Sequence, residues 1–356
     1  MRIAHVRELH GPVGAPWRLA AAPPAAGPQG VPAPVPDRWV DLELVRRRLV
    51  AHDPGRAHNA ILFRQPITTL DELLSRGIRI EALGELIEGF GGPSVPGAEE
   101  DDAILEPANL AFGPPILRPP GFRDFYAFER HVKTMWERRG GEVPEAWYRL
   151  PIFYFSNTSE IRGPNDPVWA PLGSVELDFE LEVGAVVDTP AYNLSEERAA
   201  EAIGGYFVLN DWSARDLQRD ETAVRLGPAK GKDFATSIGP WIVTPDELAD
   251  LWQPGATGPD LQLTASVATA DGREVKVSEG NWASAQFSFA QMLARASTDV
   301  HVRPGEILGS GTVGSGCLLE VKDDTLGRWL EPGDEVSLRI DRLGELRSPV
   351  IARLVS

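Results

Sequence analysis

The stretch GYFVLNDWSARD, residues 205–216, changes from apolar to polar within a few positions. Tyr206 to Leu209 form a short apolar run after two glycines, a pattern typical of a strand that is covered on both faces. Asp211 follows where this strand would leave the core. A carboxylate there is unstable unless a base, several hydrogen-bond donors or a cation neutralises it. We therefore expect the fold to be organised around this strand, with a polar site at its end.

A second stretch, LDFELEV at residues 177–183, alternates apolar residues with acids. On a strand the apolar side chains would share one face and Asp178, Glu180 and Glu182 the other. Acids two positions apart lie roughly 7 Å from each other at about 3.3 Å per residue, so Glu180 and Glu182 could touch one ion. A solvated acidic face is the alternative. The next residues, 184–187, are apolar on both faces and favour a strand that enters a two-sided core.

The segments LDFELE, NDWSARD and LGPAKGKDF, in this order and spacing, resemble the fumarylacetoacetate hydrolase family. The resemblance runs from about Pro114 to about Ile340. It implies a mixed β-roll and a set of metal ligands, which are Asp124, Glu180, Glu182 and Asp211. Four oxygen ligands without His or Cys favour a hard ion, Mg²⁺ or Ca²⁺ with Mn²⁺ as a further option, over zinc.

The resemblance also implies the catalytic residues. We expect a helix that opens at residues 122–126 and carries His131 two turns after Asp124, on the same face. Glu320, expected on a strand, would orient His131 and help to hold water. Lys232 would balance the acids and stabilise a developing oxyanion. The family's substrate contacts fall on Tyr126, Tyr154, Gln218 and Thr312, and Arg139 only approximates the place of an expected Arg.

The composition sets limits on partners and location. The chain has 356 residues, a formal net charge of −17 and one cysteine, Cys317. Such an acidic balance argues against nucleic acid and anionic membranes and favours a small-molecule partner. A single cysteine excludes an internal disulfide framework. We expect a cytoplasmic protein because no apolar run approaches the ~20 residues of a transmembrane helix and the start is charged. The resemblance implies a homodimer.

The pattern of elements predicts two domains in the α+β class. Residues 1–110 would form a small α+β domain with strands at 1–9 and 17–21, an Ala/Pro-rich loop at 22–36, and helices at 40–50, from Thr69, and at 81–87. Residues 111–356 would form the strand-rich catalytic domain, a mixed β-sandwich roll. Its clearest elements are a hairpin around Asp271-Gly272, a helix capped by Ser195, a helix that starts at Thr244-Pro245 and a helix from Ser288 to Ser297.

Two glycine-rich segments imitate nucleotide-binding motifs. GSGTVG at residues 309–314 matches the dinucleotide fingerprint, but Cys317 to Val321 reads as a strand where a helix is required. Residues 227–232 resemble a phosphate loop that is one residue short and followed by Asp233. We expect neither segment to bind a nucleotide.

The resemblance and the candidate residues together predict a divalent-metal-dependent hydrolase. It would cleave a C–C bond in a 1,3-dicarbonyl acid of the fumarylacetoacetate or acylpyruvate type, with the ion polarising the diketo group and His131 and Glu320 activating water. The alternatives are a decarboxylase, hydratase or isomerase of the same fold that acts through a metal-bound enolate, or a non-catalytic protein. The His131 and Glu320 pair favours hydrolysis over the first group, and the intact acid set disfavours the second.

Overall fold

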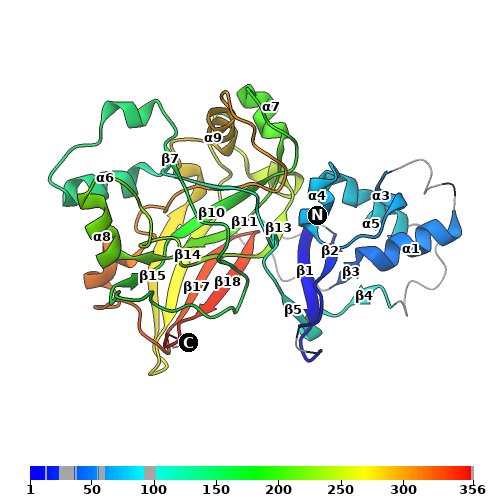
Figure 1. The fold of residues 1–356 in the computed structure, drawn as a ribbon, viewed down its shortest axis with the longest axis horizontal. Helices are drawn as coiled ribbons and strands as arrows, with labels where there is room; N and C mark the ends of the chain where they lie inside the picture. The colour runs from blue at the N-terminus through cyan, green and yellow to red at the C-terminus, as the bar shows by residue number, and fades with distance from the viewer. Residues whose placement is uncertain are drawn as a thin grey trace.

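A computed structural model describes residues 1–12, 14–23, 36, 38–53, 55, 61–91 and 102–353. Within these residues, twelve strands form one large sheet whose main path runs from the N-terminal region into the region after residue 110 (Figure 1). In spatial order the path is β4 (Ile104–Leu105), β3 (Trp39–Asp41), β2 (Arg18–Ala22), β1 (Arg2–Glu8), β13 (Thr236–Val243), β11 (Ile203–Asp211), β10 (Leu181–Val187), β16 (Ile307–Gly309), β6 (Phe122–Phe125) and β7 (Phe153–Phe155). Beside it, β5 (Leu110–Phe112) pairs with β1 and β8 (Ile161–Arg162) pairs with β13.

The centre of this sheet is covered on both faces. Every residue of β10 and β11 is buried. Because strand side chains alternate, Tyr206 and Val208 join one hydrophobic cluster while Phe207 and Leu209 join the other. The prediction that the run from Tyr206 to Leu209 is a fully covered strand is confirmed.

A second sheet covers one face of the first. It contains β15 (Glu274–Asn281), β14 (Gln262–Ala268), β17 (Glu335–Ile340) and β18 (Gly344–Pro349), in this order. Inward side chains of β14 and β17, such as Leu263 and Leu338, share a cluster with Val208 of the large sheet. The predicted hairpin joins β14 to β15, and Gly272 at its turn has φ +85°, which a glycine adopts without strain. Two layers of sheet therefore form the larger core.

N-terminal helices cover part of the other face (Figure 1). They are α1 (Leu42–His52), α3 (Ile61–Arg64), α4 (Leu70–Ser75), η1 (Ile80–Leu83) and α5 (Gly84–Gly91). Asp41 caps α1 by accepting hydrogen bonds from the backbone N–H groups of Glu43 and Leu44, and Thr69 caps α4. Most of the predicted Ala/Pro-rich loop at 22–36 lies outside the described residues.

The large sheet crosses the predicted boundary near residue 110. Strand β1 pairs antiparallel with β13, with Arg2 opposite Val243 and Ile3 opposite Ile242. The N-terminal region thus adds strands to the large sheet by backbone hydrogen bonds. The division into residues 1–110 and 111–356 stays a prediction.

The remaining elements surround the sheets. The helices are α6 (Glu129–Arg138), α7 (Glu196–Glu201), α8 (Arg215–Ala223), α9 (Phe289–Ala296) and α10 (Leu318–Val321). Short 3₁₀ helices are η2 (Pro107–Asn109), η3 (Glu145–Tyr148), η4 (Pro245–Leu251), η5 (Trp282–Ser284) and η6 (Lys322–Asp324), and β9 (Leu177–Asp178) pairs with β12 (Ser213–Ala214). Ser195 caps α7 as predicted, and the helix predicted from Ser288 to Ser297 is α9, with Ser288 as its N-cap. The helix after Thr244 is 3₁₀.

Two local predictions are wrong. Residues 122–125 form strand β6, not the start of a helix, because they pair with β16 and β7. Residues 318–321 form helix α10, not a strand. The acidic segment is divided into β9 and β10, but β9 keeps the register of the ladder, with Asp178 opposite Ser213 and Leu181 opposite Asn210. Asp178 and Glu180 both pair with Arg215, so these two acids lie on one side as predicted.

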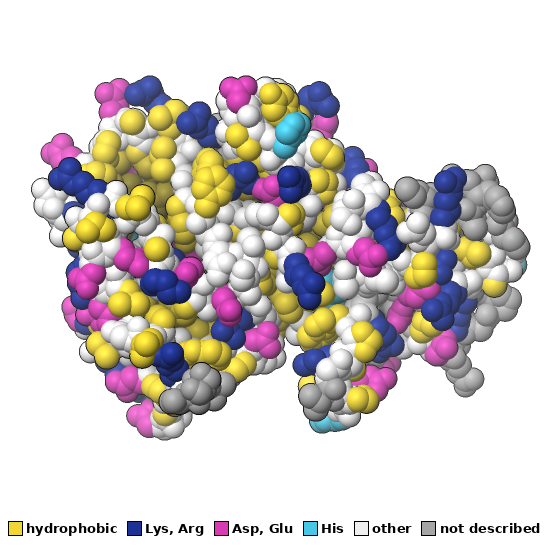
Figure 2. Space-filling view, viewed as in Figure 1, with side chains coloured by type: hydrophobic (Ala, Val, Ile, Leu, Met, Phe, Trp, Pro, Cys, Tyr) yellow, Lys and Arg dark blue, Asp and Glu magenta, His cyan; other side chains and the backbone are white. Residues whose placement is uncertain are grey.

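The predicted α+β class is confirmed. Among the described residues no helix is both long and apolar enough to cross a membrane. Over the described part of the face in Figure 2, acidic and basic side chains are interspersed with hydrophobic ones. This face therefore presents no broad field of one charge.

Candidate active site

Three buried carboxylates meet where neighbouring strands of the large sheet run side by side. Asp124 lies in β6, Glu182 in β10 and Asp211 at the end of β11. One oxygen of each lies within 4.8 Å of the others, and each side chain is at least 97% buried. A solvated acidic face, the alternative for Glu182, is excluded.

Unpaired oxygen atoms in this cluster fit a bound cation. Glu182 accepts a hydrogen bond from the backbone N–H of Gly311 at 3.0 Å through Oε2, while its Oε1 has no hydrogen-bond partner. Asp124 Oδ1 and Asp211 Oδ1 are likewise buried without a partner. Since buried carboxylate oxygens are costly without a donor or cation, a hard divalent ion is the group that this oxygen set fits.

The ionisation of the three acids points the same way. Burial raises the pKa of Asp124 well above its ordinary value, and the charge of Asp211 raises it further. Burial and the charges of Asp124 and Asp211 raise the pKa of Glu182 in the same way. Burial also raises the pKa of Asp211, although Lys232 opposes this effect. The protein itself supplies too little positive charge for three ionised acids, and a divalent ion would supply the remainder.

Glycine at position 309 makes the cluster possible. Strand β16 lies between β10 and β6, with Gly309 opposite Asp124 and Gly184 in the register. A Cβ atom at Gly309 would lie 2.3 Å from Asp124 Oδ1 and 2.9 Å from Glu182 Oε2, closer than real Cβ contacts allow. The missing side chain thus leaves the space that the two carboxylates occupy.

The fourth predicted ligand, Glu180, lies beside the cluster and is paired with cations of the protein. Its Oε2 is 2.5 Å from Lys232 Nζ and its Oε1 is 2.8 Å from an Arg215 nitrogen. Burial would raise the pKa of Glu180, but Lys232 and Arg215 hold it below its ordinary value. Glu180 is therefore an ionised, fully paired acid at the edge of the candidate metal site.

Lys232 links Glu180 to the cluster. Its Nζ donates to Asp211 Oδ2 at 2.6 Å, and the Tyr154 hydroxyl donates to the same oxygen at 2.5 Å. Burial alone would lower the pKa of Lys232, but Asp211 and Glu180 raise it, so the ammonium stays charged. A buried cation is thereby fixed at the pocket wall.

The loop that carries Lys232 is the segment that imitates a phosphate loop. Its backbone N–H groups at Ala229, Lys230 and Gly231 donate to the carboxylate of Glu221, at 2.6–3.2 Å. An acid of the protein thus takes the position where a phosphate would bind. That this loop binds no nucleotide stays a prediction.

Sequence reasoning assigned no role to a buried ion pair behind the site, Asp178 with Arg215. Arg215 Nε donates to Asp178 Oδ2 at 2.8 Å, and Asp178 also accepts the backbone N–H groups of Leu318 and Leu319 at the start of α10. Arg215 ends the NDWSAR motif. Its position in this motif was the sequence signal that could have pointed to an ion pair with the nearby acids. The pair connects the acidic segment to the helix that carries Glu320.

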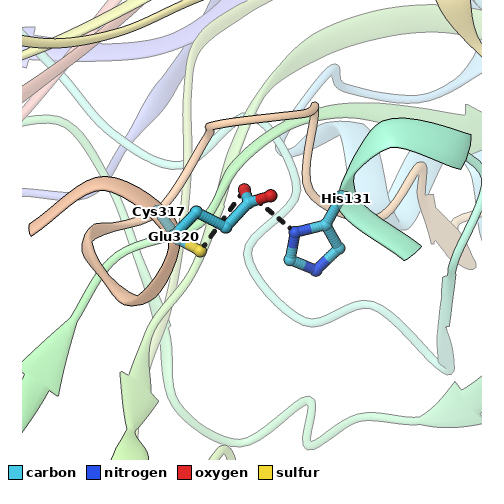
Figure 3. Close-up of side chains that lie close together, drawn as sticks. All are labelled: His131, Cys317 and Glu320. Atoms are coloured by element: carbon cyan, nitrogen blue, oxygen red, sulfur yellow. Dashed lines mark hydrogen bonds and ion pairs between the residues drawn. The ribbon is translucent and has the colours of Figure 1, made fainter. Parts of the chain in front are cut away.

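His131 and Glu320 form a second group in the same region (Figure 3). His131 lies in α6 and Glu320 in α10, and His131 Nδ1 is 3.1 Å from Glu320 Oε2. In Figure 3 the Nδ1 edge of the ring faces Glu320 and the Nε2 edge is turned away from it. The Tyr126 ring packs edge-on against the imidazole, with 5.4 Å between ring centroids. Glu320 and Tyr126 thus fix the orientation of the imidazole. A base that accepts a proton at Nε2 requires such a fixed orientation.

The sequence brings Asp124 and His131 together for a different reason from the one predicted. Asp124 is on a strand and His131 on the following helix, which begins at Glu129, so the two do not share a helical face. The short connection is fixed by a hydrogen bond from the Ala127 N–H to the Ser310 carbonyl. The strand end and the helix start therefore converge on one place.

One pocket of about 370 Å³ is lined by members of both groups, namely Asp124 and Glu182 of the acid cluster and His131 of the second group. All the predicted substrate contacts also line it; they are Tyr126, Tyr154, Gln218, Thr312 and Arg139. Gln218 accepts a hydrogen bond from Arg215, and Arg139 is exposed at the C-terminal end of α6. The predicted metal ligands in its wall are Asp124, Glu180 and Glu182, while Asp211 lies directly behind Lys232.

Comparison with known proteins agrees with this architecture. The profile of the family described as "Fumarylacetoacetate (FAA) hydrolase C-terminal" matches residues 121–351. The fumarylacetoacetase of Arabidopsis thaliana is 31% identical over 272 residues, which cover 61% of this chain and 63% of the plant protein. The match therefore spans less than two thirds of that relative's length.

Two solved structures share the fold over nearly the whole chain. The fumarylacetoacetate hydrolase from psychrophilic Exiguobacterium antarcticum has a TM-score of 0.65 at 20% identity, covering 99% of this chain and 100% of its own. The 5-carboxymethyl-2-hydroxymuconate delta-isomerase from Mycobacterium smegmatis has a TM-score of 0.60 at 21% identity with the same coverage. At these identities the likeness establishes the fold alone.

The fold and the pocket define the class of protein, an α+β protein with a candidate acidic site for a divalent metal. The chain belongs to the fumarylacetoacetate hydrolase family, since the family profile covers well over half of it.

Proposed function

We propose that this protein is a divalent-metal-dependent hydrolase that cleaves a C–C bond in a 1,3-dicarbonyl acid of the fumarylacetoacetate or acylpyruvate type. The observation that carries the proposal is the buried His131 and Glu320 pair, which lies in the same pocket region as the acid cluster. Hydrolysis requires a base that activates water, and a histidine oriented by a carboxylate is the usual arrangement for it.

The candidate ligands of the ion are Asp124, Glu182 and Asp211, with Glu180 at their edge. Their oxygen-only set favours Mg²⁺ or Ca²⁺, with Mn²⁺ as a further option. When bound, such an ion supplies positive charge that polarises the diketo group.

The residues of the chain would perform the proton transfers. His131 takes a proton from water, the oxygen bonds to the acyl carbonyl carbon, and the C–C bond breaks with its electron pair passing to the departing enolate. His131 then returns the proton to the carbon of that enolate. Lys232, which stays charged in its buried position, faces the negative charge that develops. No covalent intermediate with the protein is needed.

The other pocket residues would orient the substrate. Tyr126, Thr312 and Gln218 offer hydroxyl and amide groups in the pocket, and Arg139 lies at its exposed side, where it could pair with a carboxylate. Tyr154 already donates to Asp211, so its role would include fixing that carboxylate.

One similar structure is an isomerase, and an isomerase of this fold would need no attacking water. The His131 and Glu320 pair therefore supports hydrolysis over isomerisation. A panel of β-diketo acids assayed with added Mg²⁺, Ca²⁺ or Mn²⁺ tests the proposal.

His131→Asn and Glu320→Gln should each lower turnover by about 10² to 10⁴, with the double variant little worse than either single one. Bound metal should be unchanged, and retention of full turnover by either variant would refute the proposed base.

We also propose a small-molecule partner, no binding of nucleic acid or membranes, a homodimer and a cytoplasmic location. The net charge of −17 supports the first two, and the likeness to the family supports the dimer. Light scattering that gives a monomer at all working concentrations would refute the dimer.

A further inference from the structure

A second cluster of metal-ligand types lies outside the acid cluster. It consists of His131, Cys317 and Glu320 (Figure 3). The Cys317 sulfur is 3.7 Å from Glu320 Oε2, and His131 Nδ1 is 3.1 Å from the same oxygen. One donor atom of each residue lies within 4.8 Å of the others. A nitrogen, a sulfur and an oxygen therefore converge on one point.

These separations suit a tetrahedral ion. With about 2.3 Å for a Zn–S bond and about 2.0–2.1 Å for Zn–N and Zn–O bonds, tetrahedral angles place N and O about 3.3 Å apart and S and O about 3.6 Å apart. The observed N···O and S···O separations, 3.1 and 3.7 Å, are within a few tenths of an ångström of these values. The mixed donor set also differs from the oxygen-only acid cluster and suits a borderline-soft ion.

The donor atoms are buried and close to an opening. Cys317 is fully buried, His131 is 96% buried, and His131 Nδ1 makes no hydrogen bond of good geometry. His131 and Leu319 both line the pocket, so an ion can reach the cluster from there. The site has three protein ligands and leaves the fourth position for water.

We propose that His131, Cys317 and Glu320 form a second metal site that binds Zn²⁺ and inhibits the enzyme. The ion would bind His131 Nδ1 and Glu320 Oε2. The contact between these two atoms orients the proposed base, so the bound ion would replace that contact. Only the inhibition depends on the proposed function, since the binding site stands on its own geometry.

Binding must displace one proton from the Cys317 thiol to solvent, forming a Zn–S bond while the imidazole and carboxylate contribute lone pairs. Burial raises the pKa of this thiol well above its ordinary value, so the thiol is neutral without a metal. A coordinating metal removes that proton outright. Zn²⁺ affinity should accordingly increase with pH.

The binding test uses Co²⁺ as a spectroscopic substitute for Zn²⁺ on the full chain in excess Mg²⁺. Cys317 is the one cysteine in the sequence, so a thiolate-to-Co²⁺ charge-transfer band in the near ultraviolet reports this site alone. Wild type should show the band and lose it when Zn²⁺ is added. Cys317→Ser and Cys317→Ala should show no band. Absence of the band in wild type would overturn the site whatever the variants do.

The inhibition test compares each protein with itself, with and without Zn²⁺, so differences in basal activity cancel. Wild type should lose about 10²-fold or more of its activity on saturation, the contribution of a positioned base, and a chelator should restore it. Cys317→Ser should be affected far less. Equal inhibition of both proteins would place the effect at the acid cluster and overturn the inhibitory role. A Co²⁺ band in a protein without hydrolase activity would refute the proposed function and leave the metal site standing.

Discussion

Glu182, a candidate metal ligand, is expected to lower the stability of the metal-free protein. In the absence of a cation, burial and the neighbouring acids Asp124 and Asp211 raise its pKa, which means that its charged form is disfavoured. Glu182→Gln removes that acid. We expect the metal-free variant to be at least as stable as metal-free wild type, while Mg²⁺ raises the melting temperature of wild type alone. Thermal unfolding with and without Mg²⁺, together with elemental analysis, measures both effects.

Glu279→Gln is the matched control, because Glu279 is exposed on β15 and pairs with Lys276. It should keep the full response to Mg²⁺. Equal Mg²⁺ shifts in Glu182→Gln and wild type would contradict the assignment of the acid cluster.

Glu43 provides a pH prediction away from the site. Burial would raise its pKa, but hydrogen bonds from Arg46, the Ile67 N–H and Arg47 lower it from 4.5 to about 2. A lowered folded-state pKa stabilises the protein fully above pH 4.5, and this stabilisation is lost as the pH falls through 2. The advantage of wild type over Glu43→Gln in the free energy of unfolding should be on the order of 1 kcal/mol at pH 6, after allowance for solvent screening. It should shrink towards pH 2, as denaturation at several pH values would show. An advantage that grows with acidity would contradict this.

Helix α10 depends on a buried acid from elsewhere in the chain, because Asp178 fixes the start of the helix. Asp178 accepts the N–H groups of Leu318 and Leu319 and pairs with Arg215. Asp178→Asn would place an amide against these donors and leave Arg215 without its main counter-charge. We expect a loss of about 3–5 kcal/mol in the free energy of unfolding, measured by chemical denaturation. Turnover should fall as well, because α10 carries Glu320.

The control is Glu176→Gln, which breaks the more exposed pair of Glu176 with Arg219. It should cost about 0–1 kcal/mol. A similar cost for both variants would show that Asp178 does not anchor the helix.

The same region shows what the sequence can and cannot predict. Asp211 was predictable, because an apolar run that ends in an acid marks a strand delivering a carboxylate to the rim of a core. The strand at Asp124 was not, since β6 depends on pairing with β16, far along the chain. Helix α10 was missed for a related reason, because its first N–H groups are satisfied by Asp178 rather than by a local cap. Residue types at motif spacing thus identified the site, whereas long-range partners decided the elements.

In the whole molecule, the N-terminal region extends the large sheet. Strand β1 covers the edge of β13, and the N-terminal helices share a cluster with Phe207, Leu209 and Ile242. A chain that begins at residue 111 would expose this edge and this apolar face. We expect it to aggregate, whereas the full-length chain stays dispersed under the same conditions. Size-exclusion chromatography with light scattering distinguishes the outcomes, and a dispersed, folded fragment would support independent domains instead.

The proposed hydrolysis requires that water activated by His131 attacks the acyl carbon. The most direct test is the reaction of an acylpyruvate in ¹⁸O-labelled water with Mg²⁺ present, followed by mass spectrometry of the products. Hydrolysis predicts one solvent oxygen in the carboxylate newly formed from the acyl group, beyond the exchange measured without enzyme. Release of carbon dioxide or of a rearranged acid without that label would contradict it.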